Sequence, residues 1–362
     1  MDRRTMLAAL SGFAMSSLAR PSRAVENPPA GRGLIGAIHD ASDHRAPEML
    51  KTPLLRSTGL SKLFQADVLL KCEHLQTTGS FKYRGASNKI RLLDAAERRR
   101  GVVTASSGNH GLAVALAGRH AGVQVTVYAP STASAAKLDA IRSYGATLEL
   151  IDDGITVGET KHSLEGRAAA KRTGRPFISP YNDLDVIAGQ GTIGLEILSE
   201  APKTDLVFLS VGGGGLAGGV GIALDDTPSS RAKLVGCWPH NAPALLRAIE
   251  AGKIYAVREE ATISDGTAGG LEPGAMTLGI CSRVIHKHVE ADEQLIKEAM
   301  WALAEHDHWM VEGASGVALT GLSVLRNEVK GKTAVVVLCG RNITARDYQG
   351  ALEAGKKQLR FA

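Results

Sequence analysis

The sequence is poor in aromatic residues and cysteine, and it has no long hydrophobic run. Aromatic side chains make up 4% of the 362 residues, and the four cysteines lie far apart without a C-x-x-C pair. Cysteines at such spacing exclude a disulfide-stapled miniature and provide no zinc motif. No apolar stretch approaches the roughly 20 residues of a membrane-spanning helix, so we expect no membrane insertion.

The excess of positive over negative charge is small and is concentrated at the N-terminus. The chain has a net charge of +5, and residues 1–24 contribute four arginines against one aspartate. The remaining sequence contains no basic cluster interleaved with aromatic residues. This distribution argues against a nucleic-acid partner.

Residues 1–24 have the pattern of an export signal. Arg3 and Arg4 precede a mildly apolar stretch to Ala19, and the segment ends with small residues at Ala24. The paired arginines resemble a twin-arginine signal peptide with cleavage after Ala24. This interpretation predicts a periplasmic or otherwise exported protein. If the segment is only an N-terminal arm, the protein is cytoplasmic.

Glycine and apolar residues are abundant and alternate in a regular way. The chain has 41 glycines, and hydrophobic residues make up 44%. Short β-branched runs alternate with Ala- and Leu-rich segments, which predicts right-handed crossovers and a parallel sheet. We therefore expect an α/β protein in which a compact unit near residues 100–178 interrupts a larger one. Strands are expected at 101–106, 123–129, 147–151, 205–211, 233–237 and 333–339, helices at 112–120, 133–144 and 162–172, and a polar linker at 28–36.

A lysine enclosed by small residues is the first candidate functional group. Lys82 lies in the segment Thr-Gly-Ser-Phe-Lys-Tyr-Arg-Gly at residues 78–85. A partly desolvated lysine has a lowered pKa and can form a Schiff base with an aldehyde. Alone, the segment would indicate an ordinary surface lysine.

Two further segments have the composition of anion-binding turns. Residues 106–111, Ser-Ser-Gly-Asn-His-Gly, come between a predicted strand and helix, where free backbone N–H groups can bind a carboxylate. Before Leu216 stand Gly212, Gly213, Gly214 and Gly215, whose backbone can fold around a phosphate. This run lacks the lysine of a P-loop and the spacing of a dinucleotide fingerprint, which argues against ATP and NAD.

A fourth segment, Leu-Cys-Gly-Arg-Asn at 338–342, ends an apolar strand, where open α/β sheets bind ligands. Together and in this order, the four segments resemble the fold-type II pyridoxal-phosphate enzymes, within them the threonine/serine dehydratase and serine racemase family. The likeness runs from about residue 54 to residue 342 and includes Val-Ile-Ala-Gly-Gln-Gly-Thr-Ile at 186–193.

The resemblance has consequences for architecture. It implies the tryptophan synthase β-like fold, with two open, twisted, mostly parallel sheets and helices on both faces. Residues 25–99 plus 179–362 would form a large domain that binds pyridoxal 5'-phosphate, and residues 100–178 a small mobile domain. It also implies a homodimer that acts on a small amino-acid substrate.

The resemblance assigns the cofactor-binding roles residue by residue. Lys82 would hold the cofactor covalently and then act as the base on the Cα proton of the substrate, with Phe81 beside the ring. Asn109 would hydrogen-bond the ring oxygen. The phosphate would be held by Gly212–Gly215 and Leu216.

The same comparison places the substrate and a second catalytic group. Ser106, Asn109 and His110 would surround the substrate carboxylate. Ser107 stands where the resembling racemases have a serine that works on the ring face opposite the lysine, whereas many dehydratases have alanine. It would then be catalytic; the alternative is a spare hydroxyl in a loop.

Cys339 would face the pyridine nitrogen and would decide the type of reaction. A thiol leaves that nitrogen largely neutral, which favours prompt loss of a β-leaving group over a long-lived carbanion. The predicted reaction is β-elimination from L-threonine or L-serine, giving a 2-oxo acid and ammonia. Alternatives are a serine or aspartate racemase, a 3-hydroxyaspartate-type (hydroxyectoine-pathway) dehydratase and, from another class, a non-catalytic amino-acid- or pyridoxal-binding protein.

The sequence departs from the family pattern at one predicted metal site. Many relatives have Glu-Pro after the strand at 233–237, and that Glu binds a divalent cation. Here the pair is Trp238-Pro239, and Ala244 stands at the second acidic position. Because hard cations need oxygen ligands, we expect no metal. Glu312 would lie near the cofactor in the family, although helix capping explains an acidic residue there nearly as well.

Overall fold

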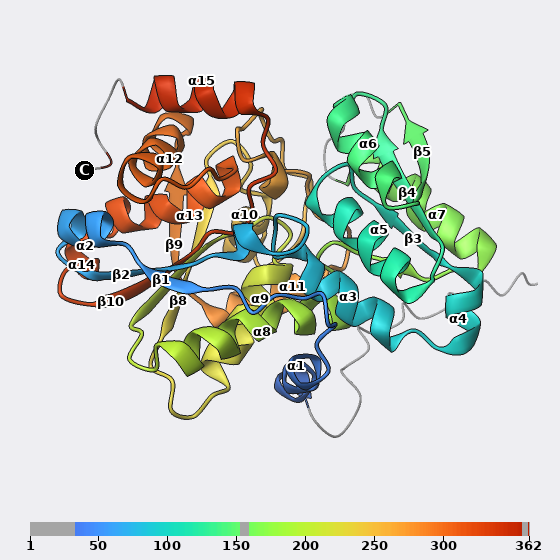
Figure 1. The fold of residues 1–362 in the computed structure, drawn as a ribbon, viewed down its shortest axis with the longest axis horizontal. Coiled ribbons are helices and arrows are strands. Elements are labelled where there is room, and N and C mark those ends of the chain that lie inside the picture. Colours follow the sequence, from blue (N-terminus) through green and yellow to red (C-terminus); the bar gives the residue numbers. More distant parts are fainter. Residues whose placement is uncertain (1–32, 153–158, 357–360, 362) are drawn as a thin grey trace, which may run out of the picture.

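Two sheets of unequal size organise the chain (Figure 1). The computed structural model describes residues 33–152, 159–356 and 361. The predicted export signal at 1–24 lies outside these residues. In the part of the chain that is described, no helix has both the length and the apolar character needed to cross a membrane.

The larger sheet has the strand order β1-β2-β10-β7-β8-β9. β1 pairs antiparallel with β2, and the other neighbours are parallel. β7 is buried along its whole length, as expected for a strand covered on both faces. The bounds are β1 (Leu54–Arg56), β2 (Asp67–Lys71), β7 (Leu206–Ser210), β8 (Lys233–Pro239), β9 (Ile285–Ala291) and β10 (Thr333–Val337).

Alternate residues of this sheet enter two separate cores. Val207 and Leu209 of β7 pack with one set of helices, and Leu206 and Phe208 pack with the other. Figure 1 shows α8 and α9 on one side of the sheet and α12, α13 and α15 on the other. The first set is α1 (Gly33–Asp43), α8 (Leu184–Glu200), α9 (Gly215–Asp225), α10 (Ala244–Ala251) and α11 (Thr277–Val284), and the second is α2 (Thr58–Phe64), α12 (Glu293–Asp307), α13 (Gly313–Val324), α14 (Arg326–Val329) and α15 (Ala345–Gly355).

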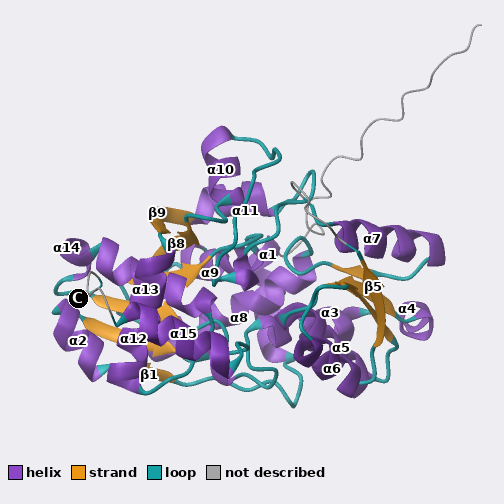
Figure 2. Cartoon of the chain, turned by 90° about the horizontal axis from the view of Figure 1, so that it is seen from above, coloured by secondary structure: helices purple, strands orange, loops and turns teal. Residues whose placement is uncertain are grey.

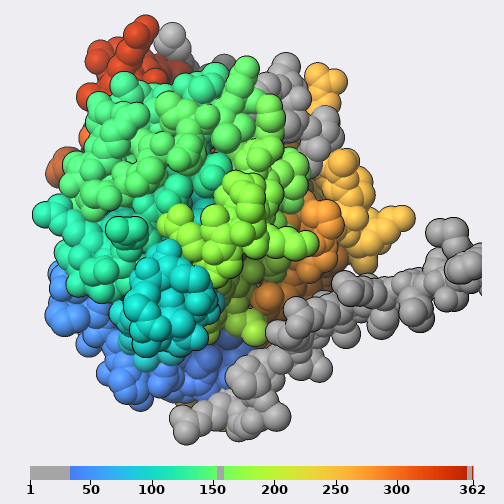
Figure 3. Space-filling view, turned by 90° about the vertical axis from the view of Figure 1, so that its right-hand side faces the viewer, coloured from blue at the N-terminus to red at the C-terminus, as the bar shows by residue number. Residues whose placement is uncertain are grey.

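The smaller sheet has the order β5-β4-β3-β6, and all of its pairs are parallel. Helix α7 covers one face, and α5 and α6 cover the other (Figure 2). In Figure 3 residues 100–178, coloured cyan to green, fill much of the face toward the viewer. The elements are α4 (Ala95–Arg100), β3 (Val102–Ala105), α5 (Asn109–Ala121), β4 (Val125–Pro130), α6 (Ala135–Ser143), β5 (Thr147–Ile151), α7 (Lys161–Thr173) and β6 (Phe177–Ile178).

Helix α3 (Lys82–Leu92) lies between the two sheets. It packs against α8 of the large sheet and α5 of the small one. Tyr83, Ala86 and Ile90 belong to the apolar core of the small sheet, while Lys82 stands at the N-terminal end of the helix. A single helix thus connects both halves of the molecule at the predicted cofactor lysine.

The predicted fold class is confirmed: both sheets are mostly parallel and carry helices. The strand predicted at 147–151 has those bounds, and the other predicted strands shift by one or two residues. The linker predicted at 28–36 is wrong from Gly33 onward, where α1 begins. Ile38 of that helix packs closely against Gly191 of α8, so tertiary burial outweighs the polar, glycine-rich local sequence.

Candidate active site

A cavity of about 640 Å³ lies where the carboxyl ends of strands from both sheets meet. Its walls include residues directly after β3, β7 and β10. In the small sheet, β4 and β5 follow one another on one side of β3, and β6 pairs with β3 on its other side. The strand order therefore reverses at β3. Open α/β sheets bind ligands at such points, and the volume falls in the roughly 300–1,000 Å³ range of small-molecule sites.

The start of α3 is fixed beside the end of β10. The backbone N–H of Phe81 donates to the carbonyl of Cys339 at 3.0 Å, and Ser80 forms an antiparallel bridge with Gly340. These contacts join the lysine segment to the fourth sequence segment. Lys82, the first residue of α3, is therefore held next to Cys339 by backbone hydrogen bonds rather than by side-chain packing alone.

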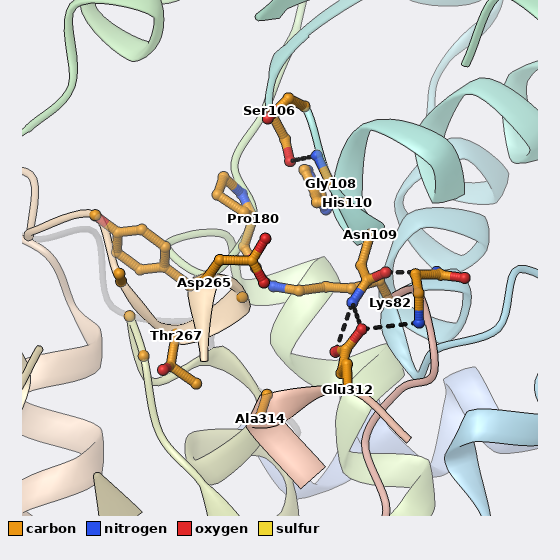
Figure 4. Close-up of a pocket in the computed structure, with 18 of the residues that line it drawn as sticks. Lys82, Ser106, Gly108, Asn109, His110, Pro180, Asp265, Thr267, Glu312 and Ala314 are labelled. Carbon is orange, nitrogen blue, oxygen red and sulfur yellow. Dashed lines mark hydrogen bonds between the residues drawn. The ribbon is translucent and has the colours of Figure 1, made fainter. Parts of the chain in front are cut away.

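The amino group of Lys82 lies inside the cavity (Figure 4). Its Nζ donates a hydrogen bond to the carbonyl of Pro180 at 2.9 Å. Burial lowers the pKa of Lys82 to about 8, although Cys339 and Glu312 act in the opposite direction. A substantial fraction of this amine is thus neutral in mildly alkaline solution and available as a nucleophile.

A buried ionic cluster anchors the first turn of α3. Arg84 Nε contacts Glu73 Oε2 at 2.8 Å, and its two terminal nitrogens reach the carboxylate of Glu196, each at 2.8 Å. Lys71 Nζ also contacts Glu196, at 2.7 Å. Because unpairing a buried charge is strongly destabilising, this cluster holds α3 against β2 and α8.

The segment after β3 supplies the opposite wall. Ser106 Oγ accepts from the N–H of Gly108 at 3.1 Å, which closes a turn just before α5. No side chain caps the N-terminus of α5, so its first N–H groups remain available to an anion. His110 Nε2 donates to the carbonyl of Ile178 at 3.1 Å, and burial lowers the pKa of His110 to about 3. This histidine is therefore neutral at physiological pH.

Asn109 joins this wall to Glu312, which precedes α13, and to Asn342, which follows β10. Its Nδ2 donates to Glu312 Oε1 at 2.8 Å and Oε2 at 3.1 Å, and its Oδ1 accepts from Nδ2 of Asn342 (Figure 4). The backbone N–H of Asn342 also donates to Glu312 Oε2, at 3.0 Å. Glu312 precedes α13 but makes no side-chain capping bond, so it orients Asn109 instead.

Burial has two consequences for Glu312. It raises the pKa of the carboxyl to about 7, and the charge of Asp265 adds to the increase while the bond from Asn109 opposes it. The carboxyl also occupies the space beside Gly340, where a Cβ would lie 2.5 Å from Oε1. A side chain at 340 would thus displace the carboxyl of Glu312 from its present position.

The glycine run after β7 leads into α9 and borders the cavity. Gly214 has φ +92° and no side chain caps α9, which leaves free N–H groups. A Cβ on Gly213 would lie 2.3 Å from the ring of Tyr181, so the loop packs directly on that ring. Gly212, Gly215 and Leu216 also line the cavity. The backbone geometry suits a phosphate.

Cys339 lies at the base of the cavity and is almost fully buried. Burial raises the pKa of its thiol to about 12, and the nearby charge of Glu312 acts in the same direction. Ser210 donates to its sulfur at 3.5 Å. The side chain is therefore a neutral thiol rather than a thiolate.

Polar contacts also cross from helices that cover the small sheet to residues 265–272, beside the cavity. Lys137 of α6 pairs with Asp265 at 2.5 Å, and both residues line the cavity. Arg167 of α7 pairs with Glu272 farther along the same boundary. Together with the Asn109–Glu312 bond, these contacts hold the two walls together.

The structure brings every predicted site residue to this one cavity. Phe81, Ser107 and the other members of the predicted set line it. Their roles toward cofactor and substrate remain predictions. Glu312 was recognisable only from the family pattern, whereas Asp265, Lys137 and His162 line the wall without a sequence motif that marked them above.

The position where relatives bind a divalent cation does not fit a metal here. Trp238 is fully buried in the apolar core, with its ring edge-to-face against His288 at 5.5 Å. Ala244 begins α10. An indole N–H and a methyl group offer no oxygen ligand. Within the described residues, no group of three or more His, Cys, Asp or Glu side chains could hold an ion.

Comparison with known proteins assigns the chain to a family. The model of the family described as pyridoxal-phosphate dependent enzymes matches residues 46–340. An L-threonine ammonia-lyase of Thermotoga maritima is 36% identical over 312 residues, which cover 85% of this chain and 76% of that protein.

Solved structures agree with this assignment. Maize serine racemase superposes with a TM-score of 0.79 at 29% identity, covering 88% of this chain and 96% of that one. Threonine deaminase isoform 2 of Solanum lycopersicum gives a TM-score of 0.82 at 27% identity, covering 90% of this chain and 89% of that one. The chain belongs to the pyridoxal-phosphate dependent enzymes and uses pyridoxal 5'-phosphate as its cofactor.

Proposed function

We propose that this protein is an ammonia-lyase that eliminates water from L-threonine or L-serine. The resulting enamine rearranges to an imine, which water then hydrolyses to a 2-oxo acid and ammonia. The observation that carries the proposal is the neutral Cys339 thiol at the base of a cavity that also contains the Lys82 amine. The residues present fit the cofactor. They provide a reactive amine, a glycine loop at a helix N-terminus and a buried hydrogen-bond donor on three converging segments.

When bound, the cofactor supplies an aldehyde that captures amino groups and a conjugated ring that withdraws electrons from the substrate's Cα. The protein's own task is to place a base beside that carbon. Lys82 Nζ has the lowered pKa that suits a base and reaches into the cavity from a rigid helix end. We propose that it first binds the cofactor and then takes the Cα proton.

Orientation of the substrate falls to the N-terminus of α5. The N–H groups of Asn109 and His110 start the helix, and Ser106 stabilises the turn before it. A carboxylate bound there would also benefit from the positive end of the helix. Because His110 is neutral, it would not oppose or neutralise Lys82 by charge; its role is to hold the turn through Ile178.

The neutral thiol at 339 favours elimination over racemisation. With a pKa of about 12, it offers a hydrogen-bond donor but no negative charge that would hold a proton on a ring nitrogen. The electron pair freed at Cα would therefore be used at once to expel the β-hydroxyl, which would leave as water after receiving the proton that Lys82 took from Cα. A carboxylate at 339 would favour a longer-lived carbanion and hence exchange of stereochemistry.

Racemisation of serine or aspartate is the second candidate, because Ser107 lines the cavity. We propose that its hydroxyl serves as a proton donor on the face opposite Lys82. The test is a Ser107→Ala variant scored for both enantiomers of the product. Loss of D-isomer formation with ammonia release preserved would support this role, whereas unchanged activities would remove it.

The polar wall of the cavity bears on which substrate side chains the protein accepts. Lys137, Ser134 and His162 give the small-domain wall a polar character that would also admit an acidic 3-hydroxy amino acid. A non-catalytic amino-acid- or pyridoxal-binding protein would have little use for the lowered pKa of Lys82. That alternative predicts a cofactor absorption band that no amino acid changes.

The proposal also covers the closure of the small domain, the oligomeric state of the protein and its cellular location. We propose that the small domain at 100–178 moves onto the large domain and excludes water, because polar pairs such as Lys137–Asp265 and Arg167–Glu272 lie on that boundary. The working form is proposed to be a homodimer. Export through the arginine-rich segment 1–24 is supported by its sequence pattern alone.

One set of measurements tests the proposal. The purified protein is expected to show a cofactor absorption band, and L-threonine or L-serine should release 2-oxo acid and ammonia in equal amounts. A panel of L- and D-amino acids, including 3-hydroxyaspartate, is scored for both products and for the opposite enantiomer. Enantiomer exchange without ammonia would contradict elimination, and activity confined to the acidic substrate would move the specificity to that class.

A further inference from the structure

Cys339 is contacted by two hydroxyl groups from different elements. Ser210 Oγ, at the end of β7, donates to its Sγ at 3.5 Å. Ser315 Oγ, in α13, lies 3.6 Å from the same sulfur. All three side chains are buried, and Ser210 and Cys339 both line the cavity.

The two serines are not equivalent, because the backbone already engages Ser315. Its Oγ donates to the carbonyl of Gly340 at 3.0 Å and accepts from the N–H of Gly340 at 3.2 Å. A hydroxyl has one proton, so Ser315 can only accept from the thiol. Ser210 is thus the hydroxyl whose proton is directed at the sulfur.

A thiol has a single proton to donate, and the partners of its sulfur decide where that proton points. When Ser210 donates to Sγ, the S–H bond must turn away from Ser210. Two directions remain, toward Ser315 Oγ or toward the cavity. A ring nitrogen in the cavity is a stronger acceptor than a hydroxyl whose lone pair is already shared with Gly340.

We propose that Ser210 is a positioning residue that turns the thiol of Cys339 so that its proton is donated to the ring nitrogen of the cofactor. The inference rests on the proposed placement of Cys339 at that nitrogen. Its consequence is chemical, because a weakly acidic donor hydrogen-bonds the nitrogen without transferring a proton to it. The Ser210–Cys339 pair would keep the ring in the state that favours elimination.

The experiment is ¹⁵N NMR of the holoenzyme reconstituted with pyridoxal phosphate labelled at the ring nitrogen. In Ser210→Ala the resonance is expected to shift toward that of a pyridine nitrogen without a hydrogen bond, and cofactor affinity to fall about fivefold. Ser210→Thr retains the hydroxyl and is expected to restore both values. Thr320→Val is the matched control, because its buried hydroxyl donates to the carbonyl of Val317 within α13.

Each result has a defined meaning. A shift in Ser210→Ala that Ser210→Thr reverses and Thr320→Val does not reproduce supports the inference. An unchanged resonance in Ser210→Ala, with a shifted one in Cys339→Ala, overturns the role of Ser210. An unchanged resonance in both variants overturns the inference at Cys339. The proposed function fails separately, if the wild-type holoenzyme binds the labelled cofactor but releases no ammonia from any amino acid.

Discussion

The two walls of the cavity are built in different ways. On the side of the large sheet, Lys82, Cys339 and the glycine loop are fixed by backbone pairing and close packing. On the side of the small sheet, Asn109 and His110 are also held in place, by Glu312 and Ile178, but Lys137 of α6 and His162 of α7 are half-exposed polar side chains. The positions on α6 and α7 can therefore change side chains without disturbing a core.

The difference in packing predicts a difference in tolerance to substitution. A cofactor of constant shape suits a rigid wall, and substrates of varied shape suit an adaptable one. The comparison predicts that substitutions in the first wall impair every substrate, while those on the cavity-lining positions of α6 and α7 alter the choice among substrates. Four variants test this prediction, and they are taken in order of decreasing expected effect.

The largest effect is expected from Lys82→Ala. The variant loses both the covalent attachment of the cofactor and the base, so kcat should fall at least about 10⁴-fold for every substrate. The measurement is ammonia release, with borohydride reduction and peptide mapping to locate the cofactor. Lys89→Ala, on the same helix but paired with Asp183 and Asp185, is the control and should keep its kcat. A pyridoxyl group on any other lysine of the wild-type protein would contradict the assignment.

Gly213→Ala should be the next most damaging change. The added Cβ would lie 2.3 Å from the ring of Tyr181 and force that ring or the loop to move. Overpacking of this kind costs about 1–3 kcal/mol, and we expect a lower melting temperature with weaker cofactor binding. Gly279→Ala, in α11, meets nothing within 4 Å and should leave both unchanged. Equal cofactor affinity in the two variants would show that the loop tolerates side chains.

Glu312→Gln tests the link between the walls. The carboxylate accepts from Asn109 and Asn342, and a pKa raised to about 7 means that activity should decline as the pH falls through 7. At pH 8, Glu312→Gln should lower kcat/KM about tenfold, because a charge-assisted hydrogen bond is lost, and should remove that acidic limb. Glu353→Gln, on the exposed face of α15, is the control. A wild-type profile that is flat between pH 6 and 8 would argue against this role.

The raised pKa of Glu312 also predicts how the stability of the protein depends on pH. The folded protein binds the Glu312 proton more tightly than the unfolded chain, because burial raises the pKa from 4.5 to about 7. The free energy of unfolding contributed by this group should therefore fall as the pH rises from about 4.5 to about 7. Denaturant titrations at several pH values in this window give the free energy of unfolding. That free energy should fall more steeply with rising pH in the wild type than in Glu312→Gln.

The smallest effect is expected from Lys137→Ala. The pair with Asp265 is partly exposed, so its loss should raise KM only about two- to fivefold and leave kcat nearly unchanged. Added salt should produce a similar change in the wild type. Arg142→Ala, which breaks an exposed pair with Asp139 on the same helix, is the control. A larger loss of kcat/KM in Lys137→Ala than in Glu312→Gln would contradict the expected ranking of these two positions.

The large-domain wall was largely predictable from the sequence. Lys82, the glycine run and Cys339 stand in contiguous segments whose residue types reflect backbone geometry and local chemistry. The small-domain contacts were not predictable in the same way. Lys137 meets Asp265 across 128 residues of sequence, and neither stands in a pattern that specifies the partner.

The sequence pattern also predicted some elements of the fold and missed others. Long apolar strands such as β7 and β10 were found because burial on both faces leaves a continuous run. β6 is only two residues long, and β9 has an alternating edge-strand pattern with exposed histidines, so neither gave that signal. Helix α1 depends on packing against α8, which no local propensity encodes.

The contact between Glu312 and Gly340 ties one backbone position to the orientation of a side chain on the opposite wall. A Cβ at 340 would lie 2.5 Å from Oε1 of Glu312, so a side chain there fits only if the carboxyl moves. Moving the carboxyl would draw it away from Nδ2 of Asn109 and from the backbone N–H of Asn342. A change at 340 should therefore be felt at Asn109, with which it makes no bond of its own.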